Sequence, residues 1–392
     1  MRILFLTHRL PYAPNRGDRI RAYHMLRAMA EFADVDLVSL VHDAHEAGRG
    51  GDLAGLAATV QVARVPAVRN RAAALFRLPG GTPLTHLLLD SPEVRPAIDR
   101  VMRRSPPDVV VAYGSGMARF ALEPPLATVP RVVDLIDVDS AKWARLAESA
   151  RFPLSAIYRR EAGILGAFER EIVARASATF VVNQRERALL DEPDRVVVLE
   201  IGMDRDFFAA PPGHGPRRGV VVTGVFDYQP NAEGVLWLVH EVWPLVRARR
   251  PDITLTLAGA NPTRALKAAA AKDPSITVTG SVPDIRPYLW RAELGAAPIH
   301  IARGVQNKVL EGVAAGLPFV ATRAVFDGLP AAVRPAVTVA DTPAGFADAI
   351  LASVSDPDTG RQVVASLSLD SLSWASTLAP LEGILRSACL RA

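Results

Sequence analysis

The sequence predicts an α/β protein with two doubly wound parallel sheets that face a central cleft. Three observations lead to this prediction. The chain has 392 residues, a length typical of two domains. Short runs rich in Val, Ile and Leu alternate with longer amphipathic segments, as in sheets covered by helices on both faces. The segment AAPPGHGPRR, residues 209–218, interrupts that alternation, because its prolines and glycines continue neither a helix nor a central strand.

The expected strands are continuous apolar runs, as suits strands that are buried on both faces. In the first half they are Ile3–Thr7, Val35–Val41, Val109–Tyr113, Val132–Ile136, Thr179–Val182 and Val196–Leu199. In the second half they are Val220–Gly224, Thr254–Ala258, Ile276–Thr279, Leu294–Pro298 and Phe319–Ala321. The segments between them with helical spacing include Asp18–Glu31, Ser155–Arg175, Ala232–Arg249 and Lys308–Ala315.

These elements divide the chain into an N-terminal domain over 1–208, a linker over 209–218 and a second domain over 219–376. A C-terminal helix is expected within 377–392, and whether it crosses back to the N-terminal domain is left open. The single cysteine, Cys389, excludes an internal disulfide framework and a cysteine-based zinc site. No apolar stretch is long enough for a transmembrane helix, and the first apolar run is too short for a signal peptide. A cytoplasmic protein is therefore the default expectation.

The net charge of +4 is compatible with an anionic ligand or a membrane surface. The basic residues are scattered without a long run, so nucleic acid is not an expected partner. One candidate membrane patch lies at 151–160, where three arginines flank an apolar group of Phe152, Leu154, Ile157 and Tyr158. Packing of this helix on its own domain, with solvated arginines, is the favoured interpretation, and the membrane patch is the alternative.

The segment Leu294–Pro318 carries the strongest chemical pattern. A strand leads through a loop into a short helix that Gly316 and Pro318 end, and we expect Asn307 as its N-cap. The free N–H groups of the first helical turn form an anion site, and Lys308 adds a positive charge suited to a diphosphate. Glu311 lies one turn further and is suited to accept hydrogen bonds from vicinal hydroxyls, as on a ribose. The alternative is a Glu that complements the helix dipole and a solvated Lys.

Two loops after strands in the first half are weaker candidates. In the first, Gly17 precedes a helix and permits close backbone approach, while Arg19 and neighbouring arginines are suited to phosphate. Taken alone, this loop is better explained as a turn before a capped helix with surface arginines. The second holds the D-x-D pattern of Asp137 and Asp139, which suits a divalent cation or a base with its orienting group. Helix capping is the favoured role for Asp139, and the role of Asp137 stays open.

Several catalytic motifs are absent from the sequence. It has no G-x-G-x-x-G and no P-loop, so a P-loop NTPase is excluded. It also has neither the nucleophile elbow G-x-S-x-G nor the zinc motif H-E-x-x-H.

The segment IARGVQNKVLEGVAAGLP, Ile301–Pro318, resembles the donor-site motif of glycosyltransferase family 4, whose members have the GT-B fold. Together with four other segments, which agree in their order along the chain, it resembles the sugar transferases associated with PEP-CTERM/exosortase exopolysaccharide systems. The four segments are RILFLTHRLPYAPNRGDRIRAYHMLRAMA, RVVDLIDVDSAKW, TGVFDYQPNAEGVLWLVHEVWP and VTGSVPDIRPYL. The resemblance extends from about Met1 to Thr322.

This resemblance implies two Rossmann-like domains, with a nucleotide-sugar donor bound mostly by the second and an acceptor mostly by the first. It implies retaining transfer without a bound metal and without a cofactor. By position, Gly17 would approach the donor phosphates, Lys308 would pair with the diphosphate and Glu311 would bind the ribose. Val282 lies where the family's backbone meets the base. Donor contacts are also expected from the residues around these positions, which are Arg19, Arg303, Gln306 and Asn307.

The sequence departs from the family pattern at three places. The family motif is E-x7-E, and here Arg303 stands in place of the first Glu. After the first strand of the second domain, the sequence GVFDYQ lacks the family's basic residue, so more of the phosphate neutralisation falls to Lys308. The family's N-terminal-domain His has no clear counterpart, and Ile136 or Asp137 occupies that region.

Together these observations predict a GT-B hexosyl-type glycosyltransferase that moves a sugar from a nucleotide-diphosphate sugar to a hydroxyl acceptor. A lipid-linked saccharide of exopolysaccharide synthesis, at the cytoplasmic face of the inner membrane, is the expected acceptor. Lys308 and Asp137 are the candidate catalytic residues. The alternatives are a catalytically silent GT-B protein that binds a nucleotide sugar or a partner, a nucleotide-sugar epimerase, and a metal-dependent transferase using Asp137 and Asp139. The base, the sugar, the acceptor and the oligomeric state are not determined by the sequence.

Overall fold

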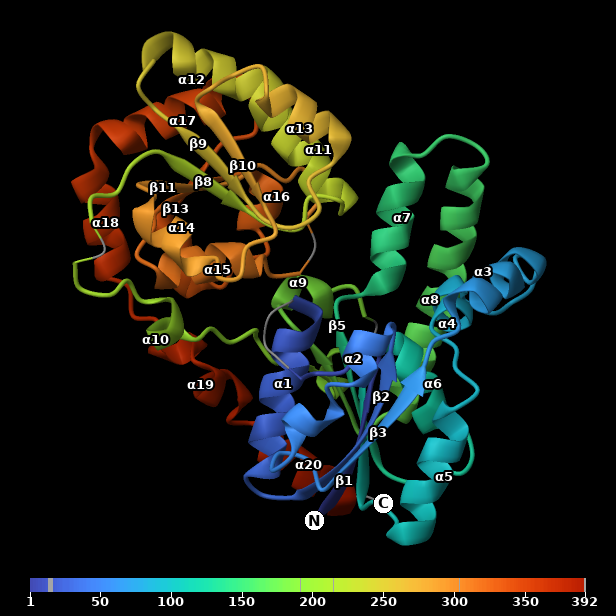
Figure 1. Ribbon diagram of the computed structural model, residues 1–392. Coiled ribbons are helices and arrows are strands. Elements are labelled where there is room, and N and C mark those ends of the chain that lie inside the picture. Colours follow the sequence, from blue (N-terminus) through green and yellow to red (C-terminus); the bar gives the residue numbers. More distant parts are fainter. Residues whose placement is uncertain (13–16, 191, 214, 303, 391–392) are drawn as a thin grey trace. The chain divides into compact units, whose positions relative to one another are not determined.

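The computed structural model describes residues 1–12, 17–190, 192–213, 215–302 and 304–390. The chain forms two compact units, each with one parallel sheet and its helices (Figure 1). Unit 1 comprises Met1–Ile201 together with Thr377–Ala392, and unit 2 comprises Gly202–Ser376. The division thus falls at Ile201 and Gly202, ahead of the Pro-rich segment 209–218. The C-terminal helix α20 (Leu381–Leu390) contacts α1, β4 and β5 of unit 1.

Unit 1 contains a seven-stranded sheet in the order β3-β2-β1-β4-β5-β6-β7, and every neighbouring pair is parallel. The strands are β1 (Arg2–Thr7), β2 (Asp34–Val41), β3 (Thr59–Arg64), β4 (Val109–Tyr113), β5 (Arg131–Ile136), β6 (Ala178–Val181) and β7 (Val196–Val198). The expected strands of the first half are present within a residue or two of their predicted bounds. Strand β3 was not predicted, because it is a half-exposed edge strand that alternates polar and apolar residues.

The helices of unit 1 pack on both faces of this sheet. They are α1 (Gly17–Ala30), α2 (Ala44–Ala47), α3 (Ala67–Phe76), α4 (Leu84–Leu88), α5 (Val94–Arg104), α6 (Ser115–Leu122), α7 (Asp139–Ser149), α8 (Leu154–Arg175), α9 (Gln184–Arg187) and α20. One core cluster joins the central strands to α5, α6 and α8, with fully buried Leu6, Val110 and Ile172 among its members. The apolar runs of the sequence therefore end in the interior, as the hydrophobic effect requires.

Unit 2 contains a six-stranded sheet in the order β10-β9-β8-β11-β12-β13, again entirely parallel. The strands are β8 (Val220–Thr223), β9 (Leu255–Ala258), β10 (Ile276–Gly280), β11 (Leu294–Ala297), β12 (Phe319–Ala321) and β13 (Val337–Val339). Strand β13 was not predicted, because this edge strand is not a continuous apolar run and places an exposed Thr338 between two valines. The expectation of two α/β units built on parallel sheets is confirmed.

The helices of unit 2 are α10 (Arg205–Phe208), α11 (Gln229–Trp237), α12 (Trp243–Arg249), α13 (Arg264–Ala270), α14 (Arg286–Arg291), α15 (Asn307–Ala314), α16 (Arg323–Phe326), α17 (Pro343–Ser355) and α18 (Pro357–Ala365). Helix α19 (Trp374–Leu378) leads back to unit 1. The predicted helix Ala232–Arg249 is α11 and α12 joined by a π-helical turn, Leu238–Val242. Trp243 is fully buried at this joint and donates from Nε1 to Ser275 Oγ at 2.9 Å.

Both sheets share a strand order that reverses direction at one point. In unit 1 the reversal lies between β1 and β4, and in unit 2 it lies between β8 and β11. Open parallel sheets bind ligands at the carboxyl ends of the strands beside such a switch point. The topology therefore directs the search for a site to the loops after these four strands. Within the described residues, no helix combines the length and the apolar character needed to cross a membrane.

A fully buried ion pair connects the first helix of unit 1 to its sheet. Arg21 of α1 donates from Nε to Asp134 Oδ2 of β5 at 2.7 Å, and from Nη1 to the Glu200 carbonyl at 3.1 Å. The second Asp134 oxygen accepts from the Ile136 amide at 3.0 Å. Removing one partner of such a pair leaves a charge buried without compensation.

We expect Arg21→Met to lower the free energy of unfolding by about 3–5 kcal/mol, because Asp134 is then buried unpaired. Urea unfolding followed by circular dichroism measures this loss. The matched control is Arg386→Met, which breaks the solvent-exposed pair of Arg386 with Glu382 and should change the stability little. Equal effects of the two substitutions would show that burial does not set the strength of the Arg21 pair.

Candidate functional site

The carboxyl edge of the unit 2 sheet is shaped by close backbone contacts that only glycine allows. A Cβ on Gly234 of α11 would lie 2.0 Å from the carbonyl oxygen of Pro298, the residue after β11. A Cβ on Gly259, after β9, would lie 1.8 Å from the carbonyl oxygen of Gly224, after β8. These contacts bring α11 and the loop ends together at the switch point between β8 and β11.

Helix α15 begins at this edge and is held at its far end by a glycine turn. Gly316 has a φ of +83° and donates to the Val313 carbonyl at 2.9 Å, while Leu317 donates to the Gly312 carbonyl at 2.9 Å. This is the Schellman arrangement, so the predicted role of Gly316 at the end of the helix is confirmed.

The start of α15 differs from the prediction. Gln306 occupies the N-cap position without a side-chain cap, and Asn307 is the first helical residue. The expected capping role of Asn307 is therefore wrong, because the helix begins one residue earlier. Its Oδ1 is buried and accepts no hydrogen bond from the described residues. Among the described residues, no side chain is found to cap the first-turn amides, so they remain suited to an anion.

Lys308 is fixed in position by a residue of another helix. Its Nζ donates to Asn231 Oδ1 at 2.7 Å, and Asn231 Nδ2 donates to the Val225 carbonyl at 2.9 Å. A Cβ on Gly224 would lie 3.3 Å from Nζ, so the glycine leaves room for the ammonium group. The mobile lysine expected from the sequence is thus held beside the end of β8. The sequence analysis missed Asn231, whose only signal is a polar residue on the inward face of α11.

Burial changes the pKa values of Lys308 and Glu311 in opposite directions. Desolvation lowers the pKa of the Lys308 amine to about 8, against the opposing effect of the Glu311 charge. Desolvation raises the pKa of the Glu311 carboxyl to about 7, against the opposing effect of Lys308. The Glu311 carboxylate makes no hydrogen bond to another group of the described residues, although the Glu311 carbonyl accepts from the Ala315 amide at 3.0 Å within the helix. The pair therefore offers a cation and an unengaged carboxylate one helical turn apart.

A pocket of about 530 Å³ lies at the ends of β9 and β10, in the same unit. Its lining residues are Asn261, Pro262, Lys267, Val278, Thr279, Gly280 and Ser281. Gly280 and Asn261 both have positive φ, at +69° and +54°, which turns the chain sharply at the pocket wall. Val282 is half-buried two residues beyond Gly280.

The candidate residues near the N-terminus have different surroundings. Helix α1 begins at Gly17, and the loop over 13–16 lies outside the described residues, as does Arg303. Arg19 is buried and donates to Glu46 Oε1 at 3.0 Å and to the Tyr12 hydroxyl at 3.2 Å. This ion pair connects α1 to α2 and gives Arg19 a structural role. From the sequence we expected only a contact to phosphate.

At the carboxyl edge of the unit 1 sheet, His8 and the D-x-D segment follow β1 and β5. His8 Nδ1 lies 3.3 Å from the Tyr113 carbonyl, and the two rings stack at 5.4 Å. Val138, not Asp139, is the N-cap of α7, so the favoured capping role of Asp139 is wrong. Burial raises the pKa of Asp139, while Lys142 and His8 act in the opposite direction. The sequence analysis did not single out His8.

Asp137 follows a strained residue at the end of β5. Ile136 has a φ of +68°, a left-handed conformation that is unfavourable for a β-branched side chain. Asp137 donates its backbone N–H to the Leu135 carbonyl at 2.9 Å and is half-buried. Among the described residues, no group of three or more His, Cys, Asp or Glu is arranged to hold a metal ion.

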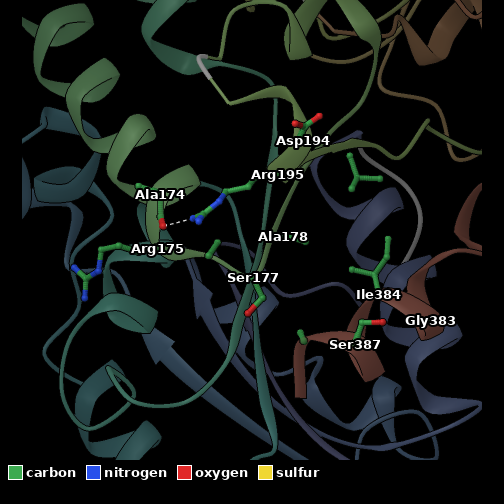
Figure 2. A pocket seen from close by; sticks show the side chains of 12 residues that line it. Ala174, Arg175, Ser177, Ala178, Asp194, Arg195, Gly383, Ile384 and Ser387 are labelled. Carbon is green, nitrogen blue, oxygen red and sulfur yellow. Dashed lines mark hydrogen bonds between the residues drawn. The ribbon is translucent and has the colours of Figure 1, made fainter. Parts of the chain in front are cut away.

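Another pocket, of about 460 Å³, lies in unit 1 between the end of α8, the start of β6 and α20 (Figure 2). Its arginines are already engaged, since Arg195 donates to the Ala174 carbonyl and Arg175 to Glu171 and the Leu122 carbonyl. Because it adjoins the amino end of β6, it lies away from the switch point. We therefore place the candidate site at the carboxyl edge of the unit 2 sheet and not in this pocket.

A comparison with known protein families also points to unit 2. Residues 217–356 match the family model of the glycosyl transferases group 1. The match falls within unit 2 and includes Asn231, Lys308 and Glu311. No curated protein sequence matches the chain.

Solved structures resemble the whole chain. The structure of Anabaena HepE in complex with UDP is 14% identical, covers 100% of this chain and 98% of its own, and has a TM-score of 0.65. WaaG, a glycosyltransferase involved in lipopolysaccharide biosynthesis, is 16% identical over 96% of this chain and 99% of its own, with a TM-score of 0.64. A putative UDP-N-acetylglucosamine 2-epimerase from Listeria monocytogenes is 11% identical over 99% and 97%, with a TM-score of 0.59. The fold is that of GT-B proteins, as the sequence predicts.

We expect Lys308→Met to raise the pKa of Glu311 above about 7, because the neighbouring positive charge is what lowers it. A pH titration of the ¹³C-labelled Glu side chains by NMR measures the shift. The control is Lys272→Met, which removes an exposed ammonium outside this edge and should leave the Glu311 titration unchanged. An unchanged Glu311 pKa in Lys308→Met would contradict the coupling of the two groups.

Proposed function

We propose that the chain is a nucleotide-sugar glycosyltransferase that transfers a hexosyl group to a hydroxyl acceptor. The observation that carries this proposal is the position of Lys308, which Asn231 holds, and of Glu311 one turn further along α15, beside the switch point of the unit 2 sheet. The group 1 family match and the GT-B neighbours support a nucleotide-sugar glycosyltransferase. One of those neighbours, Anabaena HepE, was solved in complex with UDP-glucose.

In the proposed donor complex, the diphosphate lies against the first-turn amides of α15 and the Lys308 ammonium. Glu311 accepts hydrogen bonds from the ribose hydroxyls, and the backbone at Val282 meets the base. Gln306, Asn307 and Arg303 are the further donor contacts. The unpartnered Asn307 Oδ1 supports this assignment, because a buried amide oxygen without a donor is suited to a ligand hydroxyl.

The transfer breaks the bond between the anomeric carbon and the diphosphate oxygen and forms one between that carbon and the acceptor oxygen. The acceptor hydroxyl gives its proton to an oxygen of the departing diphosphate. Negative charge grows on the departing nucleoside diphosphate, and Lys308 with the α15 amides is placed to stabilise it. We propose that the anomeric configuration is retained and that no metal or cofactor takes part. Asp137, after β5, is the proposed polar contact for the acceptor hydroxyl.

We further propose that the enzyme belongs to glycosyltransferase family 4 and acts in exopolysaccharide synthesis. The support is the resemblance of five ordered segments to the PEP-CTERM/exosortase-associated transferases. A lipid-linked saccharide at the cytoplasmic face of the inner membrane is the proposed acceptor.

We expect donor binding to be strongest between about pH 7 and 8. Above that range Lys308 loses its charge, and below it Glu311 is protonated and no longer a full acceptor. Calorimetric titration of UDP-, GDP-, ADP- and dTDP-sugars across this range measures the profile, with and without EDTA. Glu311→Gln should remove the acidic limb and weaken binding about ten- to a hundredfold. A flat profile in the unmodified protein would contradict the proposed roles of both groups.

Lys308→Met should lower kcat by about a hundred- to a thousandfold, since it removes one charge contact to the leaving group. Lys272→Met is the control and should retain full turnover. Turnover that is unchanged in Lys308→Met would contradict the assignment. Donor binding without transfer would instead favour a catalytically silent binding protein, and an epimerised sugar formed without acceptor would favour an epimerase, the activity named for the Listeria neighbour.

A further inference from the structure

Helix α3 exposes its apolar face to solvent. Val68, Ala72, Leu75 and Phe76 recur at the spacing of one helical face, and Val68, Leu75 and Phe76 are 84%, 75% and 87% exposed. The opposite face holds the helix to unit 1. There Asn70 is buried and donates from Nδ2 to the Leu88 and Asp90 carbonyls, at 3.1 and 2.7 Å. The face of α3 that carries Asn70 therefore contacts unit 1, and the apolar face stays exposed to solvent.

Arginines border this face on both sides. At 100° per residue, Arg69 and Arg71 flank the apolar stripe, and Arg77 follows its end. No Asp or Glu occurs between Asp52 and Asp90 in the sequence. None of the three arginines is paired with a carboxylate of the described residues. An apolar stripe with basic flanks is the pattern of helices that lie in a membrane interface.

The connection between α7 and α8 repeats this composition. Phe152 and Leu154 are 84% and 51% exposed, beside exposed Arg151 and Arg159. Residues 149–160 contain no acidic side chain. Of the apolar group predicted here from the sequence, Tyr158 packs instead against Trp143, with ring centroids 5.3 Å apart.

Both segments are anchored to the same part of α8. The Glu161 carboxylate accepts from the Leu84 and Thr85 amides at 2.9 and 3.2 Å, and Arg160 donates to the Gly80 and Thr82 carbonyls. The chain from α3 to α4 is thereby held against the first half of α8. Figure 1 shows α3 and α4 beside α8, protruding from the unit.

We propose that α3 and the α7–α8 connection form one docking surface for an anionic lipid bilayer. The apolar side chains enter the headgroup boundary, and the arginines pair with lipid phosphates. A second copy of the chain fits this surface poorly, because a two-fold contact would place arginines against arginines without a carboxylate on either side. The inference deepens the proposed function, which needs a membrane only for its acceptor. Lipid binding itself needs neither donor nor acceptor.

The test is flotation of the full chain with vesicles of phosphatidylcholine alone or mixed with phosphatidylglycerol. We expect binding to the mixed vesicles that weakens with added salt, since the charge part is screened. Arg69→Gln with Arg71→Gln should weaken binding about fivefold for each charge removed. Phe76→Ser with Phe152→Ser should weaken it about tenfold or more, by removing the inserted apolar groups.

Matched controls are Arg103→Gln with Arg104→Gln on α5, and Leu245→Ser on α12, which alter exposed residues of the same kinds elsewhere. These should bind as the unmodified chain does, and circular dichroism checks that each variant is folded. No binding to the mixed vesicles, or equal binding by all variants, overturns the proposal. It is also overturned if the arginine and phenylalanine double variants change only the molar mass in solution, which would make the surface a contact between copies. Glycosyl transfer to a water-soluble acceptor is measured separately, so a failure of lipid binding does not coincide with a failure of the proposed enzyme.

Discussion

Parallel strand pairing is the constraint on which the rest of this structure depends. Every neighbouring pair in both sheets is parallel, so each strand must return through a crossover before the next begins. All carboxyl ends of a sheet therefore lie at one edge, and their loops meet there. In unit 2 this collects Gly224, Pro298 and the start of α15 from distant parts of the sequence. The strand order then reverses between β8 and β11, which leaves that edge open to a ligand.

A charged side chain at such an edge is costly to bury unless it has partners. Lys308 has Asn231 as a hydrogen-bond acceptor and Glu311 as an opposite charge, but burial still lowers its pKa. The positive charge of Lys308 is therefore only partly compensated in the free protein. A further negative charge nearby would stabilise the charged form of the amine. A diphosphate supplies that charge, which connects the energetics of the free protein to its proposed ligand.

In unit 1, charged side chains are buried and two aromatic side chains are exposed. Its charged residues Arg21, Asp134 and Glu46 lie in the interior and are paired with opposite charges, whereas Phe76 and Phe152 are exposed. A buried ion pair contributes less to stability than its charge attraction, because both groups lose their hydration. An exposed aromatic side chain gains nothing from the hydrophobic effect on folding. The buried pairs hold α1 and the loop ends in place at the carboxyl edge. The exposed aromatics have no such role within the unit, and their arginine neighbours point to a contact outside the chain.

The sequence by itself determined the α/β class, most strands, the short helix that ends at Gly316 and the candidate pair of Lys308 and Glu311. It did so because continuous apolar runs, glycine turns and helical spacing are local properties of the chain. Only the tertiary structure decided that Asn231 holds Lys308, that Arg19 pairs with Glu46, and that Asn307 begins the helix instead of capping it. The contacts of Asn231 and Arg19 join residues up to 77 positions apart in the sequence. No local sequence pattern specifies which residues will pair in this way. The exposed face of α3 was decided in the same way, since an amphipathic stripe does not reveal which of its faces the fold covers.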